Sequence, residues 1–256
     1  MSRARPLLAL ALAPLLIGAA KPRLVPDLSQ RTIDIAYSFT GAELLLFGAI
    51  VYPGGQAPED GDKAADIIVV VRGPAQSVTV REKRKIAGIW MNADSLRYRS
   101  APSYYAIASS RPVDQLLDER TRAIYELGLD SMQLSPASTA PITEQNRFAA
   151  GLVALKTKQG LYADVPHAVE ITDGVLYRAR VQIPALVPVG RFTAETFLVR
   201  DGHVLAVATR TLHIRKSGFE RFVAKSADTD SFAYGLTVVA LSVALGWGAG
   251  WIARRV

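Results

Sequence analysis

Hydrophobic and polar residues alternate with a period of two along much of the chain. From Ile33 to Phe39 every second residue is a large apolar one, which is typical of a half-buried strand. Residues 40–42 (Thr-Gly-Ala) have the composition of a turn, and residues 43–52 resume as a strand that we expect to be buried on both faces for most of its length. The pattern therefore predicts a β-hairpin over residues 33–52.

Further short strands separated by Gly and Pro predict a mainly β fold. Asp201-Gly202 is a strong signal for a hairpin turn between two of them. Many short strands with this punctuation indicate immunoglobulin-like β-sandwich regions at 21–111 and 161–216, which form either two sandwiches or two halves of one. The additional strands are expected at 66–72, 77–81, 86–91, 104–109, 175–183, 191–200 and 203–215.

A helical insert or linker is expected between the two β regions, over residues 112–160. Apolar residues recur there at helical spacing from Val113 onward. A second helix runs to about Lys158, with Thr143 as a candidate N-cap and Phe148 on its apolar face. The expected fold is thus mainly β with a two-helix insert.

Both ends of the chain carry the signals of an envelope protein. Residues 1–20 combine arginines, a short apolar run and small residues, as in a signal peptide; cleavage after Ala20 and retention as an uncleaved anchor both fit. Residues 231–253 include 21 consecutive uncharged residues, which predicts a single transmembrane helix. An amphipathic juxtamembrane helix is expected at 217–230 and a short cytoplasmic tail at 254–256. The chain would then be a single-pass protein of the bacterial inner membrane, with its bulk in the periplasm and its C-terminus in the cytoplasm.

Charge and cysteine usage narrow the chemistry. The chain has a net charge of +7 and no cysteine, so it has neither disulfides nor a thiol nucleophile. The most basic internal run places four cations between the apolar residues of expected strands, as a solvated strand face or a contact for anions or anionic lipid. Export argues against nucleic acid as a partner. These cations are Arg81, Lys83, Arg84 and Lys85.

We find no catalytic, metal or cofactor motif in the sequence. The three histidines, His167, His203 and His213, lack the paired spacing of many metal sites, and no serine stands in a Gly-x-Ser-x-Gly elbow. Glu43 is either exposed at a hairpin end or a partly buried carboxylate that pairs with a basic residue such as Arg72 or Arg81.

Two sets of residues are candidates for binding. Ser242, Gly246 and Gly250 recur every four residues in the apolar C-terminal segment, where small residues let a second helix approach closely. A tyrosine-rich stretch is either an aromatic and basic binding face or ordinary sheet surface. Its residues are Tyr98, Tyr104 and Tyr105, with Arg97 and Arg99.

The exported region and the terminal segment together resemble an alphaproteobacterial family of transmembrane proteins of unknown function. This resemblance implies a signal-bearing, single-span envelope protein without an assigned activity, and it suggests an association with anion exporters of the sulfite/taurine-related type. The stretches that carry it are "IDIAYSFTGAELLLFGAI" (33–50), "DIIVVVRGP" (66–74), "LKTKQGLY" (155–162), "LYRARVQIPALVPVGRF" (176–192) and "RKSGFERFVAKSADTDSFAYGL" (215–236).

The function that these features favour is that of a non-catalytic accessory protein. Its partners would be the lipid bilayer and another membrane protein, of which an anion exporter is one candidate. Two alternatives remain at this stage. One is a periplasmic hydrolase or metal-dependent enzyme whose site comes from distant residues. The other is an anchored sensor of a small anion that uses Arg81, Lys83 and Arg84.

Overall fold

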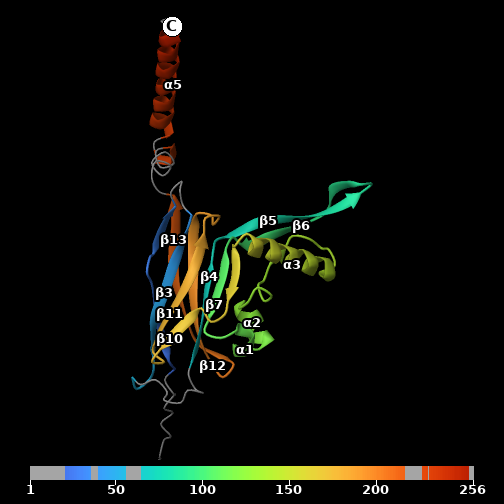
Figure 1. Ribbon diagram of the computed structural model, residues 1–256, viewed down its shortest axis with the longest axis vertical. Helices are drawn as coiled ribbons and strands as arrows, with labels where there is room; N and C mark the ends of the chain where they lie inside the picture. Colours follow the sequence, from blue (N-terminus) through green and yellow to red (C-terminus); the bar gives the residue numbers. More distant parts are fainter. Residues whose placement is uncertain (1–20, 36–39, 56–64, 217–226, 230, 254–256) are drawn as a thin grey trace, which may run out of the picture.

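The computed structural model is mainly β, as expected, and describes residues 21–35, 40–55, 65–216, 227–229 and 231–253 (Figure 1). Its strands are β1 (Arg23–Leu28), β2 (Thr32–Ile35), β3 (Gly41–Val51), β4 (Asp66–Arg72), β5 (Ala75–Ile86), β6 (Ile89–Pro102), β7 (Tyr105–Ser109), β8 (Ser135–Pro136), β9 (Tyr162–Val165), β10 (Val169–Thr172), β11 (Leu176–Pro184), β12 (Gly190–Arg200) and β13 (His203–Lys216). Its helices are α1 (Val113–Leu116), α2 (Glu119–Tyr125), α3 (Ile142–Lys158) and α5 (Ser231–Ala253).

Two sheets form a body and a third extends from it. One sheet of the body has the order β1-β3-β11-β10, and the other has the order β2-β13-β12-β4-β7-β9. The third consists of β5, β6 and the short β8. Strands from before and after the helical insert share both sheets of the body, because β3 pairs with β11 and β4 pairs with β12. The two β regions of the sequence are therefore interleaved.

The hairpin predicted over residues 33–52 is wrong. β2 pairs in parallel with β13 in one sheet, whereas β3 pairs with β1 and β11 in the other. The two strands therefore lie in different sheets. Local alternation identified both strands, but their partners come from segments far away in sequence, which a local pattern does not reveal.

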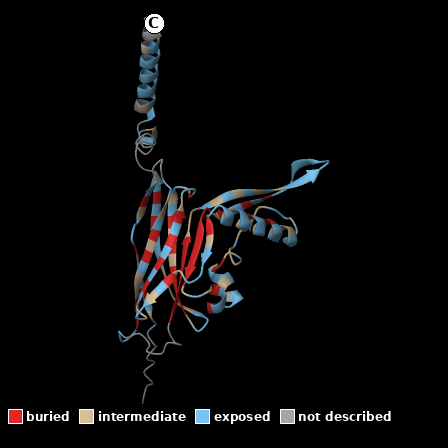
Figure 2. Cartoon of the chain, in the orientation of Figure 1, coloured by how far each residue is buried: buried red, intermediate tan, exposed pale blue. Residues whose placement is uncertain are grey.

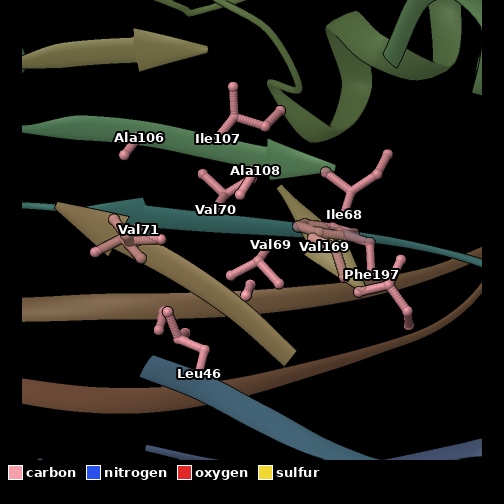
Figure 3. Packing of buried hydrophobic residues seen from close by; sticks show 14 of the residues in the cluster. Leu46, Ile68, Val69, Val70, Val71, Ala106, Ile107, Ala108, Val169 and Phe197 are labelled. Carbon is pink, nitrogen blue, oxygen red and sulfur yellow. The ribbon is translucent and has the colours of Figure 1, made fainter. Parts of the chain in front are cut away.

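β4 lies at the centre of the core. The strand has neighbours on both edges, β12 and β7, and its residues Ile67 to Val71 are fully buried. Figure 3 shows the side chains of Ile68 to Val71 among those of Ala106, Ile107 and Phe197 from the adjacent strands and Leu46 from the facing sheet. A continuous apolar run is what a strand buried on both faces requires.

β3 does not meet the expectation that it is buried on both faces. Leu44, Leu46 and Ile50 point into the core, while Phe47 and Val51 on the other face are each about two-fifths exposed. No element covers this outer face of the sheet in the described part of the chain (Figure 2).

The helical insert forms three helices rather than two. Asp118 breaks the first expected helix into α1 and α2, because its side chain caps α2 by accepting a hydrogen bond from the Thr121 amide at 2.9 Å. α3 matches the second expected helix, but its N-cap is Pro141 and no side chain caps it, so the role expected for Thr143 is wrong. Phe148 and Leu152 of α3 pack on Leu96 and Tyr98 of β6 in a small second core.

α5 stands clear of the body (Figure 1). Among the residues that the structure describes, no helix is both long and apolar enough to cross a membrane. The expected signal peptide, the tail at 254–256 and residues 217–226 of the expected juxtamembrane helix lie outside the described residues.

Candidate functional site

A long hairpin of β5 and β6 leaves the body and ends in solvent (Figures 1 and 2). Near the body it is held by the small core beneath α3. Beyond this core, the side chains of residues 81–95 are exposed except for the half-buried Glu82 and Asp94, and we call residues 81–95 the arm. Its turn, Ala87-Gly88, has positive φ at both positions, as the tight turns that match the twist of a hairpin do.

The tip of the arm is apolar and exposed. Ile86 and Met91 are each about half exposed, and Ile89 and Trp90 are each 67% exposed. Soluble proteins seldom gather large apolar side chains in this way unless they bind something there. We call these four residues the apolar tip.

The four cations predicted as an anion or lipid contact all lie on the arm, but on two faces. Lys83 pairs across the ribbon with Asn92 and Lys85 with Trp90, and paired residues in an antiparallel ribbon share a face. Alternation places Arg81 on that same face and Arg84 on the other. The structure thus brings three of the four together, beside Trp90, and separates the fourth.

Arg84 belongs to a neutralised cluster on the opposite face. Its guanidinium donates to Asp94 and, at 3.4 Å, to Glu82, and these carboxylates raise its pKa. Glu82 also accepts an ion pair at 2.7 Å from Arg147 of α3. Both carboxylates of this cluster are thus satisfied, whereas no carboxylate of the described residues pairs with Arg81, Lys83 or Lys85.

A β-bulge in β6 produces this segregation. The register shifts between Glu82 and Lys83, which pair with Asp94 and Asn92 and leave Ala93 as an extra residue. An extra residue reverses the side-chain alternation that follows it. The bulge therefore turns Trp90 to the face of the lysines and away from the face of Asp94.

The residues of the expected tyrosine-rich face are divided between core and solvent. Tyr98, Tyr104 and Tyr105 are buried, and each hydroxyl donates to a backbone carbonyl, at 3.1, 2.7 and 2.8 Å respectively. Only Arg97 and Arg99 are exposed. An aromatic binding face here is excluded, because the rings are part of the core.

Glu43 is exposed, as one of its two interpretations expected. Gln182 donates to its carboxylate at 2.9 Å and Arg180 lies 3.7 Å away. The pairing with Arg72 or Arg81 is wrong. Arg72 instead pairs with Glu195 at 2.7 Å, because β4 and β12 are neighbours.

His167 lies in a small pocket of about 240 Å³ that Glu170, Arg178 and Arg180 also line. Arg178 already holds the Glu170 carboxylate in a hydrogen-bonded ion pair, at 2.7 Å from its Nε. His203 contacts the carbonyl of Asp201 at 2.7 Å within the hairpin turn. Within the described residues, no cluster of His, Cys, Asp or Glu side chains is arranged to hold a metal ion.

A second pocket, of about 360 Å³, gathers Asp114, Asp130 and Asp164 together with Arg122. Burial within the pocket raises the pKa of Asp164, and the charges of Asp114 and Asp130 raise it further. The Asp164 side chain is still exposed to solvent, which screens these charges, so the raised pKa has only a small effect on stability. Sequence inspection missed this group because its members come from three separate segments.

The small residues of α5 line an open helix surface. A side chain at Gly246 or Gly250 would meet nothing within 4 Å. The Ser242 hydroxyl donates to the Val238 carbonyl at 2.9 Å within the same helix. The large apolar residues of α5 are exposed on all sides, from Phe232 to Trp247.

A family profile matches almost the entire chain. The family is described as "Putative transmembrane protein (Alph_Pro_TM)", and its match covers residues 23–255. The chain belongs to this family. The resemblance seen in the sequence is confirmed. No curated protein matches the chain.

Structural comparison finds the crystal structure of Spo0M, a sporulation control protein from Bacillus subtilis, at 8% identity and a TM-score of 0.32. The match covers 82% of this chain and 55% of that one. A likeness at this level supports no conclusion about fold or function.

The exposure of the apolar tip was not anticipated from the sequence. Residues 86–91 were expected as a strand, and a strand of this composition normally lies in a sheet. The available signal was the Lys-Ile-Ala-Gly-Ile-Trp run at 85–90, in which a hairpin turn directly follows the basic stretch.

Proposed function

We propose that the chain is an inner-membrane-anchored, periplasmic, non-catalytic protein that assists another membrane protein. The observation that carries this proposal is α5. Its described apolar side chains, from Phe232 to Trp247, are exposed on every side and pack on none of the described elements of the body, and a helix that is apolar all round is stable only in a core or in lipid.

The proposal treats α5 as a transmembrane anchor. Since no described helix meets the requirement for a spanning helix, the argument rests on the composition of the sequence from Phe232 to Ile252, which is 21 residues without a charge. At 1.5 Å per residue this segment is roughly 31 Å long, about the thickness of a hydrocarbon core. Arg254 and Arg255 follow it, which by the positive-inside rule directs the C-terminus to the cytoplasm and the body to the periplasm.

The interleaved sheets of the body fit an immunoglobulin-like sandwich, an architecture that commonly serves binding. The outer face of the β1-β3-β11-β10 sheet has a shallow apolar depression of about 530 Å³, lined by Val25, Phe47 and Leu176 among others. An exposed apolar surface of this kind supports a role in contacting a partner. The anion exporter that the family resemblance suggests is our candidate for that partner.

The small-residue face of α5 offers a way to dock within the bilayer. Gly246 and Gly250 are four residues apart, and their surface is open to a second helix. Leucine at both positions would block close approach while leaving the helix apolar.

The test is crosslinking in cells, followed by detergent purification of the tagged chain and mass spectrometry. We expect one membrane protein in near-equal amount with the wild type and its loss with Gly246→Leu/Gly250→Leu. A matched control, Leu241→Val/Leu245→Val, should retain it. Recovery of the chain alone from all forms would contradict an accessory role, and fractionation of the chain into the soluble periplasm would contradict the anchor.

The enzyme alternative depends on the pocket around Asp164, whose raised pKa is the one observation in its favour. The pocket holds three carboxylates and Arg122, but we identify neither a nucleophile nor an oriented base among its lining residues. This set of groups does not indicate a particular reaction. The sensor alternative needs Arg81, Lys83 and Arg84 to converge on one anion, but Arg84 lies on the opposite face in its own ion pairs.

A further inference from the structure

The arm combines two features that its fold does not require. Four large apolar side chains, those of Ile86, Ile89, Trp90 and Met91, are exposed at its end. Three cations, Arg81, Lys83 and Lys85, line one face behind that end without a carboxylate partner among the described residues.

We propose that the arm inserts its apolar tip into the headgroup region of an anionic phospholipid bilayer. Interfacial anchors have this composition: apolar and aromatic residues that enter the boundary between headgroups and acyl chains, next to lysines and arginines that attract anionic lipid. Trp90 shares its face with Lys85, so the ring and the ammonium group reach the same headgroup layer. Indole rings favour that layer because they are apolar with one polar edge.

The distribution of acidic residues supports a negatively charged ligand. Glu82 and Asp94 are the carboxylates of the arm, and Arg84 and Arg147 hold them on the opposite face. The face of Arg81, Lys83 and Lys85 therefore keeps its positive charge. Such a face is attracted to a surface of anionic headgroups.

Shape and placement favour lipid over a protein partner. The end of a two-stranded ribbon is narrow, whereas a stable protein interface buries roughly 800 Å² on each side. The arm also slants toward the end of the molecule at which β13 stops and α5 begins (Figure 1). The inference rests on the proposed function only for the anchor, which would bring the arm to a membrane surface, and it holds whichever protein the chain assists.

The test uses the full chain reconstituted into vesicles and a single reporter on the arm. The chain has no cysteine, so Ile89→Cys accepts one environment-sensitive dye. The same dye at Arg120→Cys, on an exposed position of α2, is the control. Vesicles contain phosphatidylcholine alone or equal parts of phosphatidylcholine and phosphatidylglycerol, and flotation reports whether the chain is membrane-bound.

We expect the emission of the dye at position 89 to shift to the blue with phosphatidylglycerol vesicles, and that of the dye at position 120 to stay constant. Lys83→Gln/Lys85→Gln should lower the apparent affinity of the arm for phosphatidylglycerol by about fivefold for each lysine, and Lys83→Arg/Lys85→Arg should preserve it. Trp90→Ser should weaken the shift while leaving the circular dichroism spectrum unchanged.

Several results would overturn the inference and are distinguishable from a failure of the anchor. If the chain floats with both vesicle types but the dye at position 89 does not respond, the arm does not bind lipid although the anchor stands. An equal response to both vesicle types would exclude a role for anionic headgroups. A response to native membranes but not to lipid vesicles would assign the tip to a protein. A chain that floats with neither type contradicts both the anchor and the arm.

Discussion

β4 and β5 are separated in the sequence only by Gly73 and Pro74, yet they have opposite surroundings. β4 is fully buried from Ile67 to Val71, while β5 ends among residues that no described element covers. Both segments are good strands. β4 has a strand on each edge and a second sheet opposite, whereas β5 has β6 as its one partner strand. The difference shows that the burial of a strand here depends on how many neighbouring strands and sheets surround it.

The strongest test of this comparison introduces the same charge into both regions. Val70→Asp places a carboxylate in a fully buried position without a partner, and should cost more than about 4 kcal/mol and abolish cooperative folding. Ile89→Asp at the exposed turn of the arm should change stability by less than about 0.5 kcal/mol. Thermal unfolding followed by circular dichroism measures both. Equal destabilisation would mean that the tip is packed against something.

A second test separates the base of the arm from the body. Leu152 of α3 is buried in the small core beneath β6, so Leu152→Ala should cost about 2–4 kcal/mol in that core. Hydrogen exchange should become faster in β5, β6 and α3 and remain slow in β4. Lys158→Ala, at an exposed position near the end of the same helix, is the matched control. Faster exchange in β4 would show that the two cores unfold together.

The junction between the regions provides a third test. A Cβ atom at Gly73 would lie 2.4 Å from the Ser103 hydroxyl and 3.0 Å from the backbone nitrogen of Tyr104. Gly73→Ala should therefore displace the start of the arm and cost about 1–3 kcal/mol. Gly151→Ala is the control, because a methyl group there meets nothing within 4 Å and alanine favours a helix. The denaturant midpoint of unfolding measures both variants. A Gly73→Ala variant with an unchanged midpoint would contradict the close packing at this position.

The smallest effect concerns the carboxylates of the two regions. In the body, burial and the charges of Asp114 and Asp130 raise the pKa of Asp164 above its ordinary 3.8, so the folded state binds the proton more tightly than the unfolded state does. This group therefore favours folding when protonated and opposes it as pH rises through the window above 3.8.

Asp164→Asn should accordingly be slightly more stable than the wild type at neutral pH, and the difference should vanish in acid. Glu82→Gln on the arm should have the opposite sign, because it removes the ion pairs with Arg147 and Arg84, each worth at most about 1 kcal/mol on a surface. Urea midpoints measured from pH 3 upward test both variants. A difference for Asp164→Asn that grows as pH falls would contradict the raised pKa.

Much of the fold could be predicted from local sequence. The apolar run of β4, the Asp201-Gly202 turn between β12 and β13 and the helix at α3 all depend on residues close together in the chain. The pairing of β2 with β13 could not be predicted, because it joins residues about 180 positions apart, such as Thr32 and His213. The break between α1 and α2 depends on the cap that the Asp118 side chain forms. The helical spacing of the apolar residues does not reveal this cap, so the pattern alone predicts one continuous helix.

The candidate site was predicted in composition but not in geometry. The basic residues of the arm are evident in the sequence, yet their division into two faces depends on the bulge at Ala93. A period of two, read through that residue, assigns Trp90 to the wrong face. The exposure of Ile89 could not be predicted either, because an apolar residue in a strand has the same pattern whether or not another element covers it.

The unsupported length of the arm also makes it a lever. Val80 is the last residue of β5 that packs on the small core, and from there to Ile86 the strand rises by six residues, roughly 20 Å at about 3.3 Å each. A rotation of about 10° at that base would displace the tip by roughly 3–4 Å, somewhat less than one strand spacing. A small movement of α3 would thus produce a larger displacement of the tip. In the same proportion, a force applied to the tip would produce a larger force on α3.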